Sequence, residues 1–156
     1  MKRTRKVYCE KERFEYLKQL LHEFQVTKNN DAKRQVLANL ANFCYDPINY
    51  DHMRKLNLIS ILLDLLSESN ADIVEYAIAG LCNLSPDAKN VQIIVEYNGI
   101  DKIVNCIDEQ KPQITISAIT TLIHVINNIE PSFQRHTNKE PGYNISRENK
   151  RIKQQI

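Results

Sequence analysis

The chain has 156 residues, of which 42% are hydrophobic, and this apolar content suffices for a folded core and excludes a wholly disordered protein. No apolar run approaches the roughly 18 to 20 residues of a membrane helix, and the basic first residues lead into charged residues rather than into a secretory signal. The formal net charge is +2, with +4 in each of the segments 1–13 and 134–156 and −6 between them. This favours a soluble contact platform over a uniformly basic nucleic-acid binder.

Helical periodicity follows the basic segment 1–13 and begins at about residue 14. Apolar residues recur at spacings of three and four, and this lines one face of an α-helix, as in Leu17, Leu20, Leu21 and Phe24. Sustained alternation with a period of two, which a strand would need, is absent. Turn-forming pairs divide the pattern into helical runs, at Asn29-Asn30, Asp46-Pro47, Ser69-Asn70, Ser85-Pro86, Asn98-Gly99, Lys111-Pro112 and Glu130-Pro131.

An internal repeat organises these runs. A period of 41 residues accounts for the chain from about residue 14 to about residue 129, and it places segment 37–43 on segment 78–84. We therefore predict a repeat domain over residues 14–129, followed by a basic tail over 130–156. Three leucines fall on equivalent core positions of successive helices, namely Leu40, Leu81 and Leu122.

Two motifs resemble the armadillo family, whose unit length also fits this period. Segment 90–104 looks like that family's short first helix, glycine turn and second helix, and segment 77–84 looks like the end of its third helix. At the turn, Gly99 can take a left-handed conformation without a Cβ clash. The first repeat has Leu58 there, so its turn is expected to be wider or differently closed. The resemblance implies an all-α, right-handed armadillo-repeat solenoid with about two full repeats and a partial repeat at each end.

A longer stretch narrows the resemblance. Segment 31–47, DAKRQVLANLANFCYDP, together with 79–84 and 117–122, is similar to a short eukaryotic branch of the family that is linked to pre-mRNA splicing. Over residues 14–127 this resemblance implies a non-enzymatic scaffold of the minor spliceosome. It implies an RNA-recognition-motif protein as partner and small nuclear RNA nearby, with no membrane and no small-molecule substrate. The implied location is the nucleus, with the cytoplasm as a second compartment.

Catalytic and metal chemistry finds little support in the sequence. Three glycines cannot build a glycine-rich phosphate cradle, and the four histidines share no metal-ligand spacing with one another or with the cysteines. His22 and His52 lie on helical runs as partly exposed structural residues, and three cysteines are interpreted as small buried hydrophobes, namely Cys44, Cys82 and Cys106. A Cys–His dyad across repeats stays open. No cofactor, metal or enzymatic activity is expected.

In the family, the third helices line a concave groove, and here they would span about 31–44, 72–84 and 113–128. By the resemblance, the asparagine that bonds an extended peptide falls at Asn42 and Asn83, with His124 at the third place. A bond of each asparagine to its own helix end is the alternative. The import receptors of the family have a tryptophan four residues earlier, where this chain has Ala38, Ala79 and Thr120. A receptor for basic peptides is therefore the alternative function.

Acidic residues lie near these positions. Asp46 and Asp87 stand four residues beyond the two asparagines, and Glu75 is close in the second repeat, so an acidic groove is predicted. An N-cap of the next helix is the favoured interpretation of each aspartate.

The last helix carries two apolar stripes, which is typical of a solenoid helix packed between two repeats. One stripe holds Ala118, Leu122, Val125 and Ile129, and the other holds Ile116, Ile119, Ile123 and Ile126. Residues 134–156 are polar and basic and do not continue the repeat, so the isoleucine stripe is predicted to be the principal partner-binding surface. Self-association and folding-back of the tail are the alternatives.

Overall fold

The computed structural model describes residues 9–137, with side chains through residue 128, and all regular structure in this range is helical. The elements are α1 (Glu10–Val26), α2 (Asn30–Phe43), the 3-10 helix η1 (Pro47–Asn49), α3 (Tyr50–Lys55), α4 (Leu58–Leu65), α5 (Ala71–Leu84), α6 (Ala88–Glu96), α7 (Gly99–Val104) and α8 (Pro112–Thr137). The chain divides into two compact units after Val125, so α8 begins in the first unit and ends in the second.

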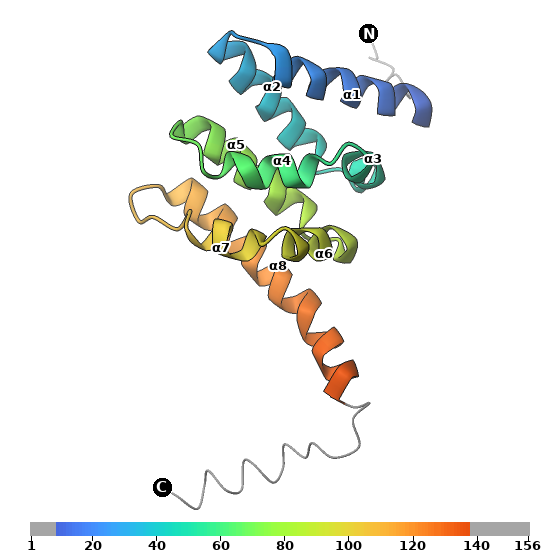
Figure 1. Cartoon of the computed structure of the whole chain (residues 1–156), viewed down its shortest axis with the longest axis vertical. Coiled ribbons are helices and arrows are strands. Elements are labelled where there is room, and N and C mark those ends of the chain that lie inside the picture. The colour runs from blue at the N-terminus through green and yellow to red at the C-terminus, as the bar shows by residue number, and fades with distance from the viewer. Residues whose placement is uncertain (1–8, 138–156) are drawn as a thin grey trace, which may run out of the picture. The chain divides into compact units, whose positions relative to one another are not determined.

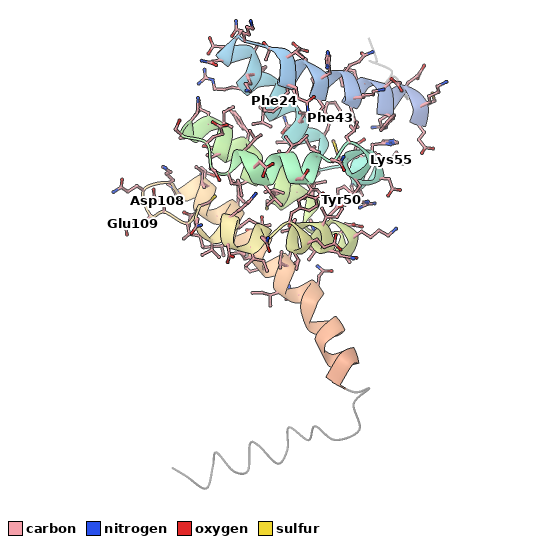
Figure 2. All side chains as sticks on the ribbon, viewed as in Figure 1. Phe24, Phe43, Tyr50, Lys55, Asp108 and Glu109 are labelled. Carbon is pink, nitrogen blue, oxygen red and sulfur yellow. The ribbon has the colours of Figure 1, made fainter. Side chains whose placement is uncertain are left out.

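The first unit is a stack of three helical layers (Figure 1). α1 and α2 form the first layer, η1 and α3 to α5 the second, and α6, α7 and the start of α8 the third. α2 packs against α1 and α5, while α4 contacts α5, α6 and α7. Apolar side chains at the predicted three- and four-residue spacings fill the spaces between helices, as Phe24 does between α1 and α2 (Figure 2). The predicted all-α repeat array is confirmed.

Side-chain caps set most helix boundaries where the sequence predicted turns. The Asn29 side chain accepts hydrogen bonds from the backbone N–H groups of residues 31 and 32, and Asn70 repeats this one period later. The predicted break at Glu130-Pro131 is wrong, because α8 continues to Thr137. Proline lacks the N–H for one helical bond but keeps a helical φ, so a long helix can continue past it at some cost.

The turn before each second helix differs from the prediction. Asn98 is the left-handed residue, with φ of 53°, and Asn57 has the same φ one repeat earlier. The two turns are therefore closed in the same way, although Leu58 replaces Gly99. Gly99 is needed for space instead, because a Cβ there would lie 2.6 Å from the Ile94 carbonyl oxygen. Asparagine tolerates the left-handed region better than most residues, which explains its use at both turns.

Two core positions also depart from expectation. Leu40 and Leu81 are fully buried, but Leu122 is only half-buried because the third layer is the last layer of the first unit. His52, expected to be partly exposed, is buried, with its ring centroid 5.5 Å from that of Phe14. α1 covers this side of α3, which a helical pattern confined to α3 does not reveal.

Candidate functional site

Isoleucines of α8 stand exposed where the sequence predicted a binding stripe. Ile116, Ile119 and Ile123 are each between 44% and 59% exposed, within the first compact unit. Ile126 is also exposed but belongs to the second unit. The surface that the first unit carries therefore has three of the four predicted isoleucines.

The repeat explains why these side chains are exposed. Ile119 is 44% exposed, whereas its equivalent Ile78, one layer earlier, is fully buried. The same holds on the second helices, where Val104 is 47% exposed and its equivalent Leu63 is 1% exposed. Core-type residues thus lie on the open side of the third layer. We call this surface the C-terminal edge, made of Val104, Ile107, Ile116, Ile119 and Ile123.

Sequence reasoning missed Val104 and Ile107, although one signal could have found them. The period of 41 places them on Leu63 and Leu66, which are buried in the layer before. The pattern of a single helix therefore includes only three of the five edge residues.

A short loop fixes the start of α8. The Thr115 Oγ1 donates to the Asp108 carbonyl oxygen at 2.7 Å and accepts from the Asp108 N–H at 3.0 Å. Figure 2 shows Asp108 and Glu109 in this loop, at one end of the third layer. On the inner face of α8, Ile114, Ala118 and Val125 are buried, so the exposed stripe belongs to a helix that is anchored by its opposite side.

Polar side chains join the second and third layers. Arg54 Nη1 donates to Asn90 Oδ1 at 2.6 Å and lies 2.8 Å from Asp87 Oδ1. Asn90 is fully buried and in turn donates from Nδ2 to the Leu84 carbonyl oxygen at 2.8 Å. We call this arrangement the arginine clasp. Because the buried amide keeps both its donor and its acceptor satisfied, the clasp stabilises the junction of the two layers.

The arginine clasp also occurs one period earlier in the chain, but not one period later. One period earlier, Arg13 Nη1 donates to Asn49 Oδ1 at 3.4 Å, so the first layer holds the second in the same way. One period after Arg54 the chain has Val95, which is exposed. The C-terminal edge therefore lacks the arginine by which each earlier layer holds the next.

The predicted groove positions bond to neighbouring layers. Asn83 Nδ2 donates to the Ala41 carbonyl oxygen at 3.0 Å, which joins α5 to α2 rather than to its own helix end. The Ser85 hydroxyl and His124 Nδ1 lie 2.7 Å apart and join α5 to α8. Asn42 is exposed. Peptide binding at these three positions stays a prediction.

The acidic groove residues have structural partners. Asp46 caps η1 by accepting from the Ile48 N–H at 3.1 Å, and Asp87 caps α6 by accepting from the Asn90 N–H at 3.0 Å. Arg54 compensates the charge of Asp87, and Glu75 is half-buried. Acidic binding by this set also stays a prediction.

No described feature builds a reactive centre. Burial raises the pKa of the Cys44, Cys82 and Cys106 thiols, which lowers their nucleophilicity at neutral pH. Within residues 9–128, no group of three or more His, Cys, Asp or Glu could hold a metal ion. In the same range, no helix is long and apolar enough to span a membrane.

Comparisons with known proteins point to one family. Residues 46–85 match the family model of the armadillo/beta-catenin-like repeat. The mouse armadillo repeat-containing protein 7 is 44% identical over 113 residues, which make up 72% of this chain and 57% of the mouse protein. The chain thus spans little more than half the length of that relative.

Solved structures show the same fold. A designed armadillo repeat protein aligns over 76% of this chain and 52% of its own, with a TM-score of 0.65 and 14% identity. Two other engineered proteins each align over 74% of this chain, covering 51% and 30% of their own, with TM-scores of 0.57 and 0.59 and identities of 14% and 15%. At such identities the likeness concerns the fold alone.

Proposed function

The chain belongs to the armadillo-repeat family, and from this premise we propose that it is a non-enzymatic scaffold that holds a protein partner in a nuclear ribonucleoprotein. The family's stacked helices present extended surfaces suited to protein–protein interaction. Cys44 and Cys106 are buried and Cys82 is only half-buried, and the raised pKa values of these three thiols also favour a binding role over nucleophilic catalysis.

The proposed setting is the minor spliceosome, with an RNA-recognition-motif protein as partner and small nuclear RNA nearby. Two observations support this setting. Residues 14–127 are similar to the short armadillo branch linked to splicing, and the 44% identity to the mouse protein covers 113 residues. The partner, rather than this chain, reads the RNA, because the layered body carries a net negative charge.

The exposed isoleucines of α8 are the main observation that supports the proposed function. Ile116, Ile119 and Ile123 follow core spacing but face solvent in the first unit, and Ile126 continues the spacing along α8. A contiguous apolar surface of this kind marks an interaction site. Burying one isoleucine contributes roughly 1.5 to 3 kcal/mol, so a single anchor can change affinity about tenfold or more.

Tagged purification of the full chain from nuclear extract tests the proposal. We expect the wild type to capture an RNA-recognition-motif protein together with a small nuclear RNA of the minor spliceosome. The Ile119→Glu variant should lose both while keeping its helical circular dichroism spectrum. Ile48→Glu is the matched control, because Ile48 is also an exposed isoleucine, on η1 in the second layer.

Two results would contradict the proposal. Normal capture by Ile119→Glu would show that the isoleucine stripe is not part of the interface. Capture of a partner without any splicing component would show that the protein does not act in the minor spliceosome. Deletion of residues 134–156 should leave capture intact. Tight binding of a lysine-rich peptide by the wild type, lost in Asp46→Asn, would favour the import-type receptor instead.

A further inference from the structure

We propose that, when no partner is bound, the C-terminal edge pairs with the same edge of a second copy of this chain. The inference uses the surface of the proposed function, so the partner and the second copy compete for it. It concerns residues of the first compact unit only.

The edge does not fit a further repeat of the same kind. Each earlier layer reaches the next through an arginine, Arg13 or Arg54, that bonds a buried asparagine. The third layer has Val95 at that position. A second inter-layer arginine, Arg34, pairs with Asp72, and its equivalents are Glu75 in the second layer and Ile116 in the third. The third layer thus has apolar side chains at two positions that are charged in both earlier layers, and the matching occupant is an apolar surface without carboxylates or amides at these points.

α8 itself supplies such a surface. Residues 112–129 contain no Asp, Glu, Lys or Arg, so two copies of the helix bring no like charges together. Ile116, Ile119 and Ile123 are spaced by three and four residues, which is the seam along which two α-helices pack side by side. Charged flanks, which select a foreign helix in such seams, are missing over residues 112–129.

The opposite end of the stack restricts the pairing to two copies. α1 turns Glu15, Lys18 and Glu23 outward on the first layer, all of them exposed. An apolar edge that stacked on this face would bury those charges unpaired, so head-to-tail growth is disfavoured. Edge-to-edge contact is self-complementary and closes after two chains. A two-fold dimer follows, with Ile119, the middle isoleucine of the three, nearest the axis.

Sedimentation velocity of the purified full chain, across a wide range of concentration, tests the inference. We expect the wild type to shift from monomer to dimer as concentration rises. Ile119→Glu should weaken this dimer by at least about tenfold, because a buried carboxylate replaces an apolar anchor. Ile48→Glu, which replaces another exposed isoleucine in the second layer, should dimerise like the wild type. Ile123→Gln is a milder variant in case Ile119→Glu loses helix content.

Cysteine cross-linking locates the contact. In a Cys9→Ser background, which removes an exposed thiol, Thr120→Cys on α8 should form a disulfide-linked dimer on oxidation. Gln19→Cys, exposed on α1, should not. A wild type that stays monomeric throughout overturns the dimer and leaves partner capture unaffected. Dimers that persist in both edge variants, or that Ile48→Glu disrupts, place the contact elsewhere and also overturn it.

Discussion

The two ends of the stack differ in the side chains that they expose on their uncovered sides. Any repeat array has a first and a last layer, and each has one side that no sister layer covers. At the N-terminal end, α1 buries Leu17, Leu20 and Phe24 against the array and turns charged residues outward. At the other end, α8 buries its inner stripe but leaves Ile116, Ile119 and Ile123 facing solvent. One end is covered by charged side chains, and the other exposes core-type residues, the surface that we propose for binding.

Equivalent positions therefore contribute differently to the free energy of unfolding, because the contribution of a side chain depends on whether another layer covers it. Leu81 and Leu122 occupy the same place in successive helices, yet one is fully buried and the other half-buried. The comparison can be sharpened by substitution, with the largest expected effect first.

Truncation of the two leucines should separate the interior from the edge. Leu81→Ala should lower the free energy of unfolding by about 2–5 kcal/mol, because it leaves a cavity between two layers. Leu122→Ala should cost clearly less, since its site is already partly open. Urea unfolding followed by circular dichroism measures both. Equal losses would mean that the third layer is covered in solution, or that the two positions are not equivalent.

Removal of the clasp arginine should have the next largest effect. Arg54→Met keeps the aliphatic stem but leaves the Asn90 amide oxygen and Asp87 without their charged donor, and we expect a loss of about 1–3 kcal/mol in stability. Val95→Arg tests the edge with the same side chain. It should change stability by less than about 0.5 kcal/mol, because the C-terminal edge has no following asparagine to receive it. A large gain from Val95→Arg would show that a hidden layer covers the edge.

The smallest effect concerns a bond within the second layer. The Tyr50 hydroxyl donates to the Asn83 carbonyl oxygen at 2.9 Å, and the equivalent residue of the third layer is Val91, which cannot. Tyr50→Phe should cost about 0.5–1.5 kcal/mol at neutral pH. Burial, with the charge of Asp87, raises the pKa of Tyr50, so the folded state holds this proton longer than the unfolded state.

The stabilisation that the Tyr50 hydroxyl provides depends on pH in a predictable way. The contribution of Tyr50 is fully present below the unfolded pKa of about 10 and is lost as pH rises through the higher folded value. Unfolding curves at neutral pH and at about pH 11 should therefore show a shallower alkaline loss in Tyr50→Phe than in the wild type. An identical alkaline loss in both proteins would refute the role of this hydroxyl.

The fold could be predicted from the sequence because each repeat shows the same helical pattern. Helical spacing, turn pairs and a constant period agree from α1 to the start of α8, and each unit repeats the others' evidence. The left-handed residue of this turn could not be predicted, because glycine permits that conformation at Gly99 whereas the structure has it at Asn98, the residue before. Which residue of an Asn-Gly pair is left-handed depends on where the next helix begins.

The candidate site was only partly predictable from the sequence, for a different reason. Periodicity finds core-type side chains such as Ile119, but it does not say whether another layer covers them. Val104 and Ile107 belong to the same edge and lie on a different helix, which a one-helix pattern cannot include. The clasp needed the structure as well, because Arg54 and Asn90 lie 36 residues apart in different layers, and the equal separation of Arg13 and Asn49 does not by itself show that the side chains meet.

The constant register of the clasps has a consequence for how such a chain can lengthen in evolution. Arg13 and Arg54, Asn49 and Asn90, and Asn57 and Asn98 recur with one period, so a tandem duplication of segment 46–86 would return each of them in phase. The duplicated Asn49 would receive the side chain of Arg54, and the duplicated Arg54 would reach Asn90. Neither end of the array would change, so a longer descendant would inherit the same charged cap and the same apolar edge. Length and binding specificity can therefore evolve independently in this architecture.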